Sequence, residues 1–258
     1  MPDWSHLDPV ERSAAMTLSW RAAESRRNDR LFADPAAEEA AARLPPWPGS
    51  AESPLFADIV ALRTLQLDEE TAAALAAGID QVVVLGAGLD TRFRRVPLPP
   101  GARAIAVDSA AVNALARTLL PADGRGERID ARLPGGLAEG LRRASFDPER
   151  ATLWIAEGLL EYLPGRAWER LVAELSGHSA AGSRALITIL GDALPVRFAH
   201  DPAFPFPRLP SIPQIVAAVP EGWRVAVVAA RRLREVPPDA FAIMVMDRAE
   251  ARAGRARD

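Results

Sequence analysis

The 258-residue chain contains no cysteine and no lysine, and each absence excludes a class of chemistry. Without cysteine the protein has no disulfide, no thiolate nucleophile, no iron–sulfur cluster and no zinc site built on cysteine. Without lysine it cannot form a Schiff base or use the phosphate-binding loop that depends on a lysine. Arginine supplies all of the basic side chains, which together with abundant alanine and proline is typical of a GC-rich genome.

Histidine is scarce, and neither sign of charge dominates. His6, His178 and His200 lie far apart in the sequence and show none of the spacings of metal ligands, so we expect no metal site. The formal net charge is −3. A chain with this charge is not expected to bind nucleic acid through bulk electrostatic attraction.

Long apolar runs are also missing, although 49% of the residues are hydrophobic and 25% are charged, as in ordinary soluble globular proteins. No run is long enough to span a bilayer, so no membrane partner is expected. The first residues, MPDWSHLDPVER, are charged and lack the apolar stretch of a signal peptide. We therefore expect a cytoplasmic protein, and the sequence leaves its oligomeric state open.

The first third of the chain has a helical pattern. Residues 8–43 carry apolar side chains at helical spacing with a break near 28–35, which predicts two helices. Four prolines mark 44–54 as a loop, and 55–77 predict a further helix. We therefore predict that residues 1–78 form an N-terminal helical cap.

Residues 79–258 are predicted to form a second unit, in which short apolar strands alternate with helices. This alternation is typical of a doubly wound α/β fold, in which a parallel sheet carries helices on both faces. The short connection before the last strand favours an antiparallel final pair. The predicted strands are 81–85, 102–107, 127–129, 152–156, 183–190, 223–229 and 240–246.

A proline-rich segment interrupts that alternation at about 192–218. It has no regular period, and a long insertion near the ligand end of an α/β sheet is typical of a lid or binding loop. Phe198, Phe204 and Phe206 could line an acceptor pocket there, or they could serve ordinary loop packing.

The stretch VVVLGAGLDTR, residues 82–92, places two glycines directly after the first strand of the sheet. Ligands of such sheets bind at the carboxyl ends of the strands, where the strand order reverses. Because Gly86 and Gly88 have no side chains, a ligand can approach the main chain there, although a tight strand-to-helix turn would explain the same residues.

Two residues of this stretch argue against a dinucleotide. Thr91 stands where the dinucleotide motif has glycine or alanine, and Asp90 lies where the pyrophosphate would sit. A carboxylate beside a phosphate costs on the order of 1 kcal/mol or more, which Arg92 could partly offset. A cationic ligand without phosphate, such as S-adenosylmethionine, has no such conflict.

The segments QVVVLGAGLDTRFRR and TLWIAEGLLEYLP resemble the signatures of the leucine carboxyl methyltransferase-like family. The segments RAAESRRNDRLFADPAA, AVDSAAV, RIDAR and GSRALIT agree in order and spacing, so the resemblance covers about residues 15–190. It implies a Rossmann-like class I methyltransferase fold and S-adenosylmethionine as cofactor. The family includes protein-phosphatase carboxyl methyltransferases and bacterial O-methyltransferases, several of which act on polyketides.

Two acids follow strands and are predicted cofactor contacts. Asp108 lies about twenty residues past the glycines, where an acid accepts hydrogen bonds from both ribose hydroxyls. Glu157 leaves the fourth strand, and the resemblance implies that it contacts the cofactor. For both acids, capping of a helix is the alternative.

The resemblance implies further cofactor contacts. Asp130 and Ala131 would lie around the adenine, although a surface turn would also suit Asp130. Arg63 would hold the methionyl carboxylate, and Arg21 resembles the family's N-terminal basic contact; either arginine could instead belong to a solvated helix face. In the glycine loop, the predicted cofactor-binding residues are Gly86, Ala87, Gly88 and Asp90.

The sequence does not identify the methyl acceptor. A protein carboxyl terminus, a polyketide carboxylate and a phenolic or enolic hydroxyl all remain open, and the predicted lid favours a small molecule. A carboxylate needs no base, whereas a phenol with a pKa of about 10 gains from one, for which His200 and Tyr162 are the candidates.

Two other functions stay open beside an O-methyltransferase. One is a nicotinamide-dependent oxidoreductase on a similar sheet, which Asp90 and Thr91 disfavour. The other is a methyltransferase fold that has been recruited to non-methylating or binding work, because a fold alone does not define a function.

Overall fold

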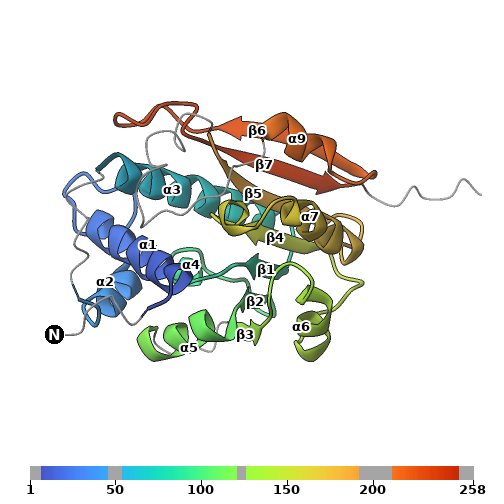
Figure 1. The fold of residues 1–258 in the computed structure, drawn as a ribbon, viewed down its shortest axis with the longest axis horizontal. Helices are drawn as coiled ribbons and strands as arrows, with labels where there is room; N and C mark the ends of the chain where they lie inside the picture. Colours follow the sequence, from blue (N-terminus) through green and yellow to red (C-terminus); the bar gives the residue numbers. More distant parts are fainter. Residues whose placement is uncertain (1–6, 46–53, 121–125, 192–210, 250–258) are drawn as a thin grey trace, which may run out of the picture.

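The computed structural model describes residues 7–45, 54–120, 126–191 and 211–249. Within them, one seven-stranded sheet has the order β3-β2-β1-β4-β5-β7-β6 (Figure 1). The strands are β1 Gln81–Leu85, β2 Arg103–Asp108, β3 Glu127–Asp130, β4 Thr152–Ala156, β5 Arg184–Leu190, β6 Trp223–Ala229 and β7 Phe241–Arg248.

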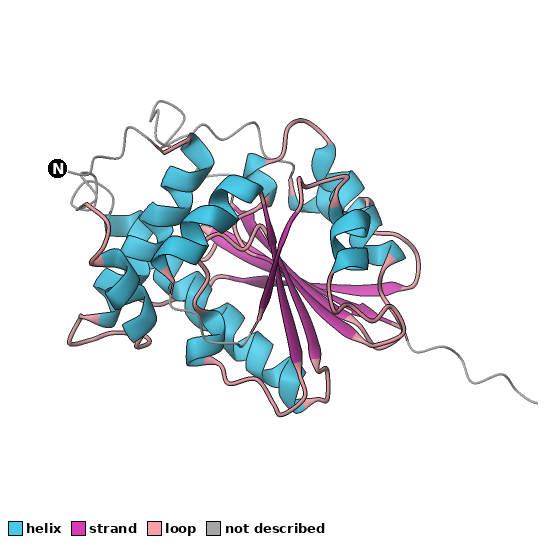
Figure 2. Cartoon of the chain, turned by 90° about the horizontal axis from the view of Figure 1, so that it is seen from below, coloured by secondary structure: helices cyan, strands magenta, loops and turns pink. Residues whose placement is uncertain are grey.

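Helices cover both faces of this sheet (Figure 2). Ahead of it in the chain lie α1 Pro9–Ser25, α2 Pro35–Ala41 and α3 Pro54–Ala76. Between the strands lie α4 Arg92–Arg95, α5 Ala110–Leu119, α6 Leu137–Arg143, the 3-10 helix η2 Leu160–Tyr162, α7 Ala167–Gly177 and α9 Ile212–Ala217.

The alternation of side chains along each strand divides the core into two layers. In β1, Val82 and Val84 pack with α3 residues such as Ile59, whereas Val83 and Leu85 pack on the opposite face with α6 and α7. All five β1 residues are buried, as expected for a central strand with helices on both faces. The sheet therefore holds the carboxyl end of β1 in a rigid frame.

The strand order reverses at β1. This strand pairs in parallel with β2 on one side and with β4 on the other. The chain passes from β1 to β2 and returns past β1 to reach β4, so the carboxyl ends of these three strands border one crevice. The doubly wound class predicted from the sequence is confirmed.

The end of the sheet also follows the prediction. Strand β7 is antiparallel to both β5 and β6, which it separates. The predicted strands 81–85, 152–156 and 223–229 have the observed limits, and the others differ by one or two residues at an end. The short helices α4, η2 and α9 were not predicted, because elements of three to six residues carry almost no periodic signal.

The predicted division into a cap and a methyltransferase unit stays a prediction. Helices α1, α2 and α3 all fall within the proposed cap. Most of the proposed lid, at 192–210, lies outside the described residues, and the rest includes α9. Among the helices of the described ranges, none is long and apolar enough to cross a membrane.

Candidate cofactor site

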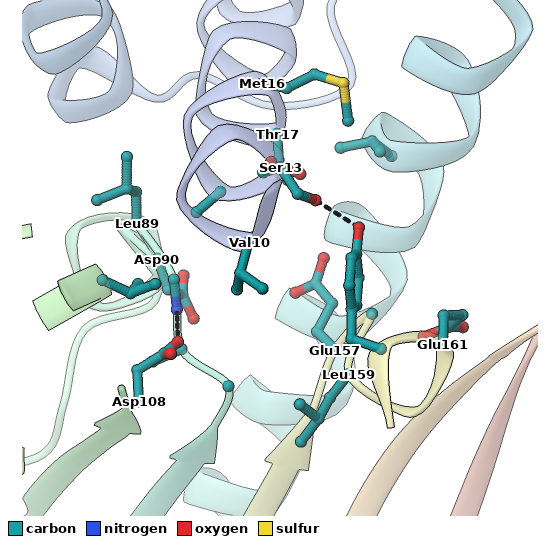
Figure 3. A pocket seen from close by; sticks show the side chains of 18 of the residues that line it. Val10, Ser13, Met16, Thr17, Leu89, Asp90, Asp108, Glu157, Leu159 and Glu161 are labelled. Atoms are coloured by element: carbon teal, nitrogen blue, oxygen red, sulfur yellow. Dashed lines mark hydrogen bonds between the residues drawn. The ribbon is translucent and has the colours of Figure 1, made fainter. Parts of the chain in front are cut away.

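A pocket opens at the carboxyl ends of β1, β2 and β4, beside helix α1 (Figure 3). Its volume is about 970 Å³ when the open space at its mouth is included. Of the residues predicted to bind the cofactor, those lining it are Arg21, Arg63, Gly86, Ala87, Gly88, Asp90, Asp108 and Glu157.

The glycine loop presents main chain to this pocket. Gly86 and Gly88 have φ angles of +61° and +52°, which side-chain-bearing residues rarely adopt. A Cβ atom on Gly86 would lie 2.7 Å from Cδ1 of Leu159. The loop therefore needs glycine both for its conformation and for the close approach of the chain beyond β4.

Asp108 is the last residue of β2 and connects the glycine loop to this strand by a hydrogen bond. Its Oδ2 accepts a hydrogen bond from the Gly88 N–H at 2.7 Å, and its Oδ1 accepts one from the Ser109 N–H at 2.7 Å. Burial raises the pKa of Asp108, while the two amide donors lower it. The side chain of Ser109 caps the start of α5. The role of helix cap, which the sequence left open for Asp108, therefore belongs to its neighbour.

Because each oxygen of a carboxylate can accept two hydrogen bonds, both oxygens of Asp108 keep acceptor capacity. Asp108 also lines the pocket. Its position therefore suits a ligand that carries two neighbouring hydroxyls, as ribose does.

Glu157 directly follows β4 and lies between two arginines. Its Oε1 accepts a hydrogen bond from Nε of Arg63 at 3.0 Å, and its Oε2 accepts one from Nη2 of Arg92. Burial by itself would raise the pKa of Glu157, but Arg63, Arg92 and Arg21 lower it to about 2. Glu157 is therefore a permanent anion of the pocket at neutral pH.

Arg92 offsets the charge of Asp90, as the sequence suggested. The Arg92 N–H donates to Oδ1 of Asp90 at 2.7 Å, and its Nη2 lies 3.6 Å from Oδ2. However, the same guanidinium, which is only 1% exposed, also pairs with Glu157 and lies 3.4 Å from Asp68. One arginine thus interacts with three carboxylates, and Arg63 and Arg95 also pair with two of them, Glu157 and Asp68.

Arg21 reaches the pocket from α1. Its Nη2 donates to the carbonyl oxygen of Leu89 at 2.7 Å, while its Nε has no hydrogen-bond partner within the described chain. Burial lowers the pKa of Arg21, and the neighbouring Asp90 and Glu157 raise it. Arg21 and Arg63 are thus buried beside acids and do not belong to a solvated helix face.

Asp130 and Ala131, at the end of β3, are not among the residues that line the pocket. The Oδ1 of Asp130 accepts hydrogen bonds from Nδ2 of Asn113 at 2.8 Å and from Arg117 at 3.1 Å. Ala131 is buried, and its N–H donates to the carbonyl oxygen of Asp108. Their role around the adenine stays a prediction.

Of the two proposed bases, Tyr162 and His200, only Tyr162 lies within the described residues. Tyr162 lines the pocket, and its hydroxyl lies 2.5 Å from Oγ of Ser13 on α1 (Figure 3). Burial is the main cause that raises the pKa of Tyr162, so even less of it is present at neutral pH as the phenolate that could accept a proton. His200 lies outside the described residues, as do Phe198, Phe204 and Phe206.

Sequence reasoning missed the contribution of α1 and the second acid after β4. Ser13, Met16 and Thr17 line the pocket from α1, and Glu161 lines it from η2. Helical spacing alone could not show which face of α1 covers the crevice. The segment EGLLEYLP did carry a signal, because an acid in an otherwise apolar run after a strand end is unusual.

The comparisons with known proteins identify the family. Residues 14–176 match the family model of leucine carboxyl methyltransferase. The chain belongs to the leucine carboxyl methyltransferase family. Its relatives include a candidate S-adenosyl-L-methionine-dependent methyltransferase of Streptomyces avermitilis, 39% identical over 202 residues that cover 71% of this chain and 70% of the relative.

A second relative and a solved structure agree with this membership. A Saccharopolyspora erythraea protein with the same candidate activity is 38% identical over 197 residues, covering 71% of this chain and 69% of the relative. A crystal structure of a candidate methyltransferase of Thermobifida fusca has a TM-score of 0.62 and 21% identity, covering 92% of this chain and 94% of that one. The latter likeness concerns the fold alone.

This methyltransferase uses S-adenosylmethionine, and the residues of the pocket fit that cofactor. The glycine loop presents Gly86, Ala87 and Gly88 to the pocket, Asp108 keeps acceptor capacity for hydroxyls, and Glu157 is ionised at neutral pH. Because the chain belongs to this family, a nicotinamide-dependent oxidoreductase is no longer an alternative. Thr91, where a third glycine would stand, instead donates to Oδ2 of the buried Asp34 at 2.6 Å.

Proposed function

We propose that this protein is an O-methyltransferase that methylates a carboxylate or hydroxyl oxygen of a small molecule, with polyketides and other secondary metabolites as the acceptor class. The observation that carries the proposal is an apolar part of the pocket wall. Its side chains, two of them aromatic, belong to one buried cluster. The apolar wall residues are Met16, Trp20, Phe56, Val60 and Leu190.

In the apolar part of the pocket wall, two aromatic side chains pack against each other. The rings of Trp20, from α1, and Phe56, from α3, have centroids 5.5 Å apart, and both residues are buried. Aromatic pairs of this kind bind flat apolar ligands through area and shape, while a few polar groups orient them. A small, largely apolar acceptor with one oxygen to be methylated matches this end of the pocket.

The cofactor, when bound, supplies the methyl group from a sulfonium centre. Asp108 would hold the ribose hydroxyls, Arg21 and Arg63 would bind the methionyl carboxylate, and Glu157 would face the positive end. The chain contributes orientation and proximity, which can be worth about 7–11 kcal/mol of a reaction barrier. Helix α1 covers the pocket and limits the access of water to the reacting oxygen.

The proposal is tested in two steps with the purified protein. Calorimetry with S-adenosylmethionine and S-adenosylhomocysteine should show binding to the wild type and weak or no binding to Asp108→Ala. Incubation with a panel of aromatic hydroxy and carboxylic acids should then release S-adenosylhomocysteine, with the new methyl group on oxygen by mass spectrometry. Methyl transfer to nitrogen or carbon only, or cofactor binding without any transfer, would contradict the proposal.

A further inference from the structure

Glu161 is a buried acid that lines the pocket, and only one of its two carboxylate oxygens accepts a hydrogen bond within the described chain. It lies on η2, is 1% exposed and lines the pocket. Its Oε1 accepts a hydrogen bond from the Leu190 N–H at 3.1 Å, whereas its Oε2 has no hydrogen-bond partner in the described part of the chain. A buried polar atom without a partner costs about 1–3 kcal/mol, so a ligand that supplied one would gain from the contact.

Among the described residues, no arginine forms a salt bridge with this carboxyl group. Arg63 influences its pKa, but the Nε of Arg63 donates to Glu157. Tyr162, the next residue, directs its hydroxyl to Ser13. Burial raises the pKa of Glu161, and the weaker influences of Arg63 and the Leu190 N–H lower it.

The position of Glu161 matches the acceptor end of the pocket. In Figure 3 it lies on the opposite side of the view from Asp108, with Glu157 between them. It borders the same hollow as the apolar wall formed by Phe56 and its neighbours. An acceptor seated against that wall would therefore have Glu161 among its few polar contacts.

We propose that Oε2 of Glu161 is the catalytic base, and that the acceptor oxygen is therefore a hydroxyl, phenolic or enolic, and not a carboxylate. This inference rests on the proposed O-methyltransferase function. The acceptor's O–H bond breaks and its proton moves to Oε2. The electron pair left on the acceptor oxygen forms the new bond to the methyl carbon, whose bond to sulfur breaks with its pair kept by sulfur.

The hydrogen-bonding state of Glu161 agrees with a hydroxyl acceptor. A carboxylate acceptor at Oε2 would bring a second acid and no hydrogen to an oxygen that has no hydrogen-bond partner in the described chain. A phenol is neutral at pH 7 and brings the hydrogen-bond donor that Oε2 lacks. A carboxyl group whose pKa is raised by burial is also a better match to a general base than an ordinary surface acid.

The test compares the wild type with Glu161→Gln. Glutamine keeps the oxygen that accepts from Leu190 but places an amide NH₂ group, which cannot take a proton, where Oε2 was. With 2-naphthol and related phenols as probes, we expect kcat to fall by about 100-fold or more. Affinity for S-adenosylhomocysteine should be unchanged, and Glu139→Gln, the same exchange at an exposed α6 position, should behave as the wild type.

The pH dependence supplies a second readout. For the wild type, kcat/KM should decrease as the pH falls through the pKa of Glu161, and this decrease should be absent in Glu161→Gln. Difference infrared spectra of wild type minus variant, recorded on the protein bound to S-adenosylhomocysteine, should show the Glu161 carboxyl becoming protonated above the ordinary glutamate pKa of about 4.3.

Several results would overturn the base role. One is a Glu161→Gln variant that methylates the phenols at the wild-type rate. Another is a wild type that methylates 2-naphthoic acid and leaves 2-naphthol unchanged. A third is a Glu161 carboxyl that titrates at its ordinary pKa. A wild type that binds neither S-adenosylmethionine nor S-adenosylhomocysteine would instead contradict the proposed function itself.

Discussion

Replacement of Glu157 by glutamine tests the electrostatics of the pocket in the absence of any ligand. The variant keeps the shape of the side chain but removes the anion that lies between Arg63 and Arg92. The pKa of Glu157 is lowered from 4.5 to about 2 in the folded protein. That difference corresponds to about 3 kcal/mol of folding free energy at neutral pH.

Loss of one partner from a buried ion pair typically costs about 3–5 kcal/mol, which agrees with this figure. We therefore expect the free energy of unfolding of Glu157→Gln at pH 7 to be about 3 kcal/mol below that of the wild type. For a chain of this length the melting temperature should fall by about 6–12 °C.

Urea unfolding at a series of pH values measures both the size and the sign of this effect. A carboxylate with a lowered pKa stabilises the folded state above its unfolded-state pKa and loses that contribution as the pH falls toward the folded-state value. The difference between wild type and variant should therefore be full at pH 7 and should shrink to about 1 kcal/mol near pH 3.

The control is Glu139→Gln, which removes the same charge from an exposed position and should change stability by less than about 0.5 kcal/mol. A Glu157→Gln variant as stable as this control at pH 7 would refute the reasoning. A difference in the free energy of unfolding that stays constant between pH 7 and pH 3 would also refute it, because protonation of Glu157 would then have no effect on stability.

Four further substitutions test the ribose contact, the glycine loop and the contact between η2 and α1. Asp108→Asn should weaken S-adenosylhomocysteine binding by about 100-fold in calorimetry, because hydrogen bonds to a charged group are worth about 1.5–3 kcal/mol each; unchanged affinity would exclude the ribose contact. Gly86→Ala should lower the free energy of unfolding by about 1–2 kcal/mol, because φ is +61° and the Cβ would meet Leu159; an unchanged melting curve would contradict this. Tyr162→Phe should cost about 1 kcal/mol by chemical unfolding, and a double variant with Ser13→Ala should cost no more than the sum of the single changes, since the two hydroxyls bond each other.

The strands were predictable because their signal is local. A buried strand such as 81–85 is a short apolar run closed by glycine, and this pattern does not depend on which helix later covers it. The same holds for Asp108 and Glu157. Each directly follows or ends such a run, and parallel strands bring their carboxyl ends to one edge of the sheet.

The position of Asp130 shows the limit of that reasoning. Asp130 also ends a parallel strand at this edge, next to Asp108 in the register of β2 and β3. Its side chain nevertheless turns to Asn113 and Arg117, and 46% of it is exposed. A strand end fixes where a residue lies, whereas the partners of its side chain depend on the neighbouring helix.

The sequence by itself determined the positions of the strands along the chain, the bare main chain at Gly86 and Gly88 and the placing of acids at the sheet edge, because these follow from the spacing of residues close together in the chain. Only the tertiary structure decided that α1 covers the crevice, that Arg63 and Arg92 share Glu157, and that one oxygen of Glu161 is left without a partner. These contacts join residues 94 and 65 positions apart in the case of Glu157. Side-chain pairing over such separations is selected by packing and by burial of charge in the folded core, and no local pattern records it.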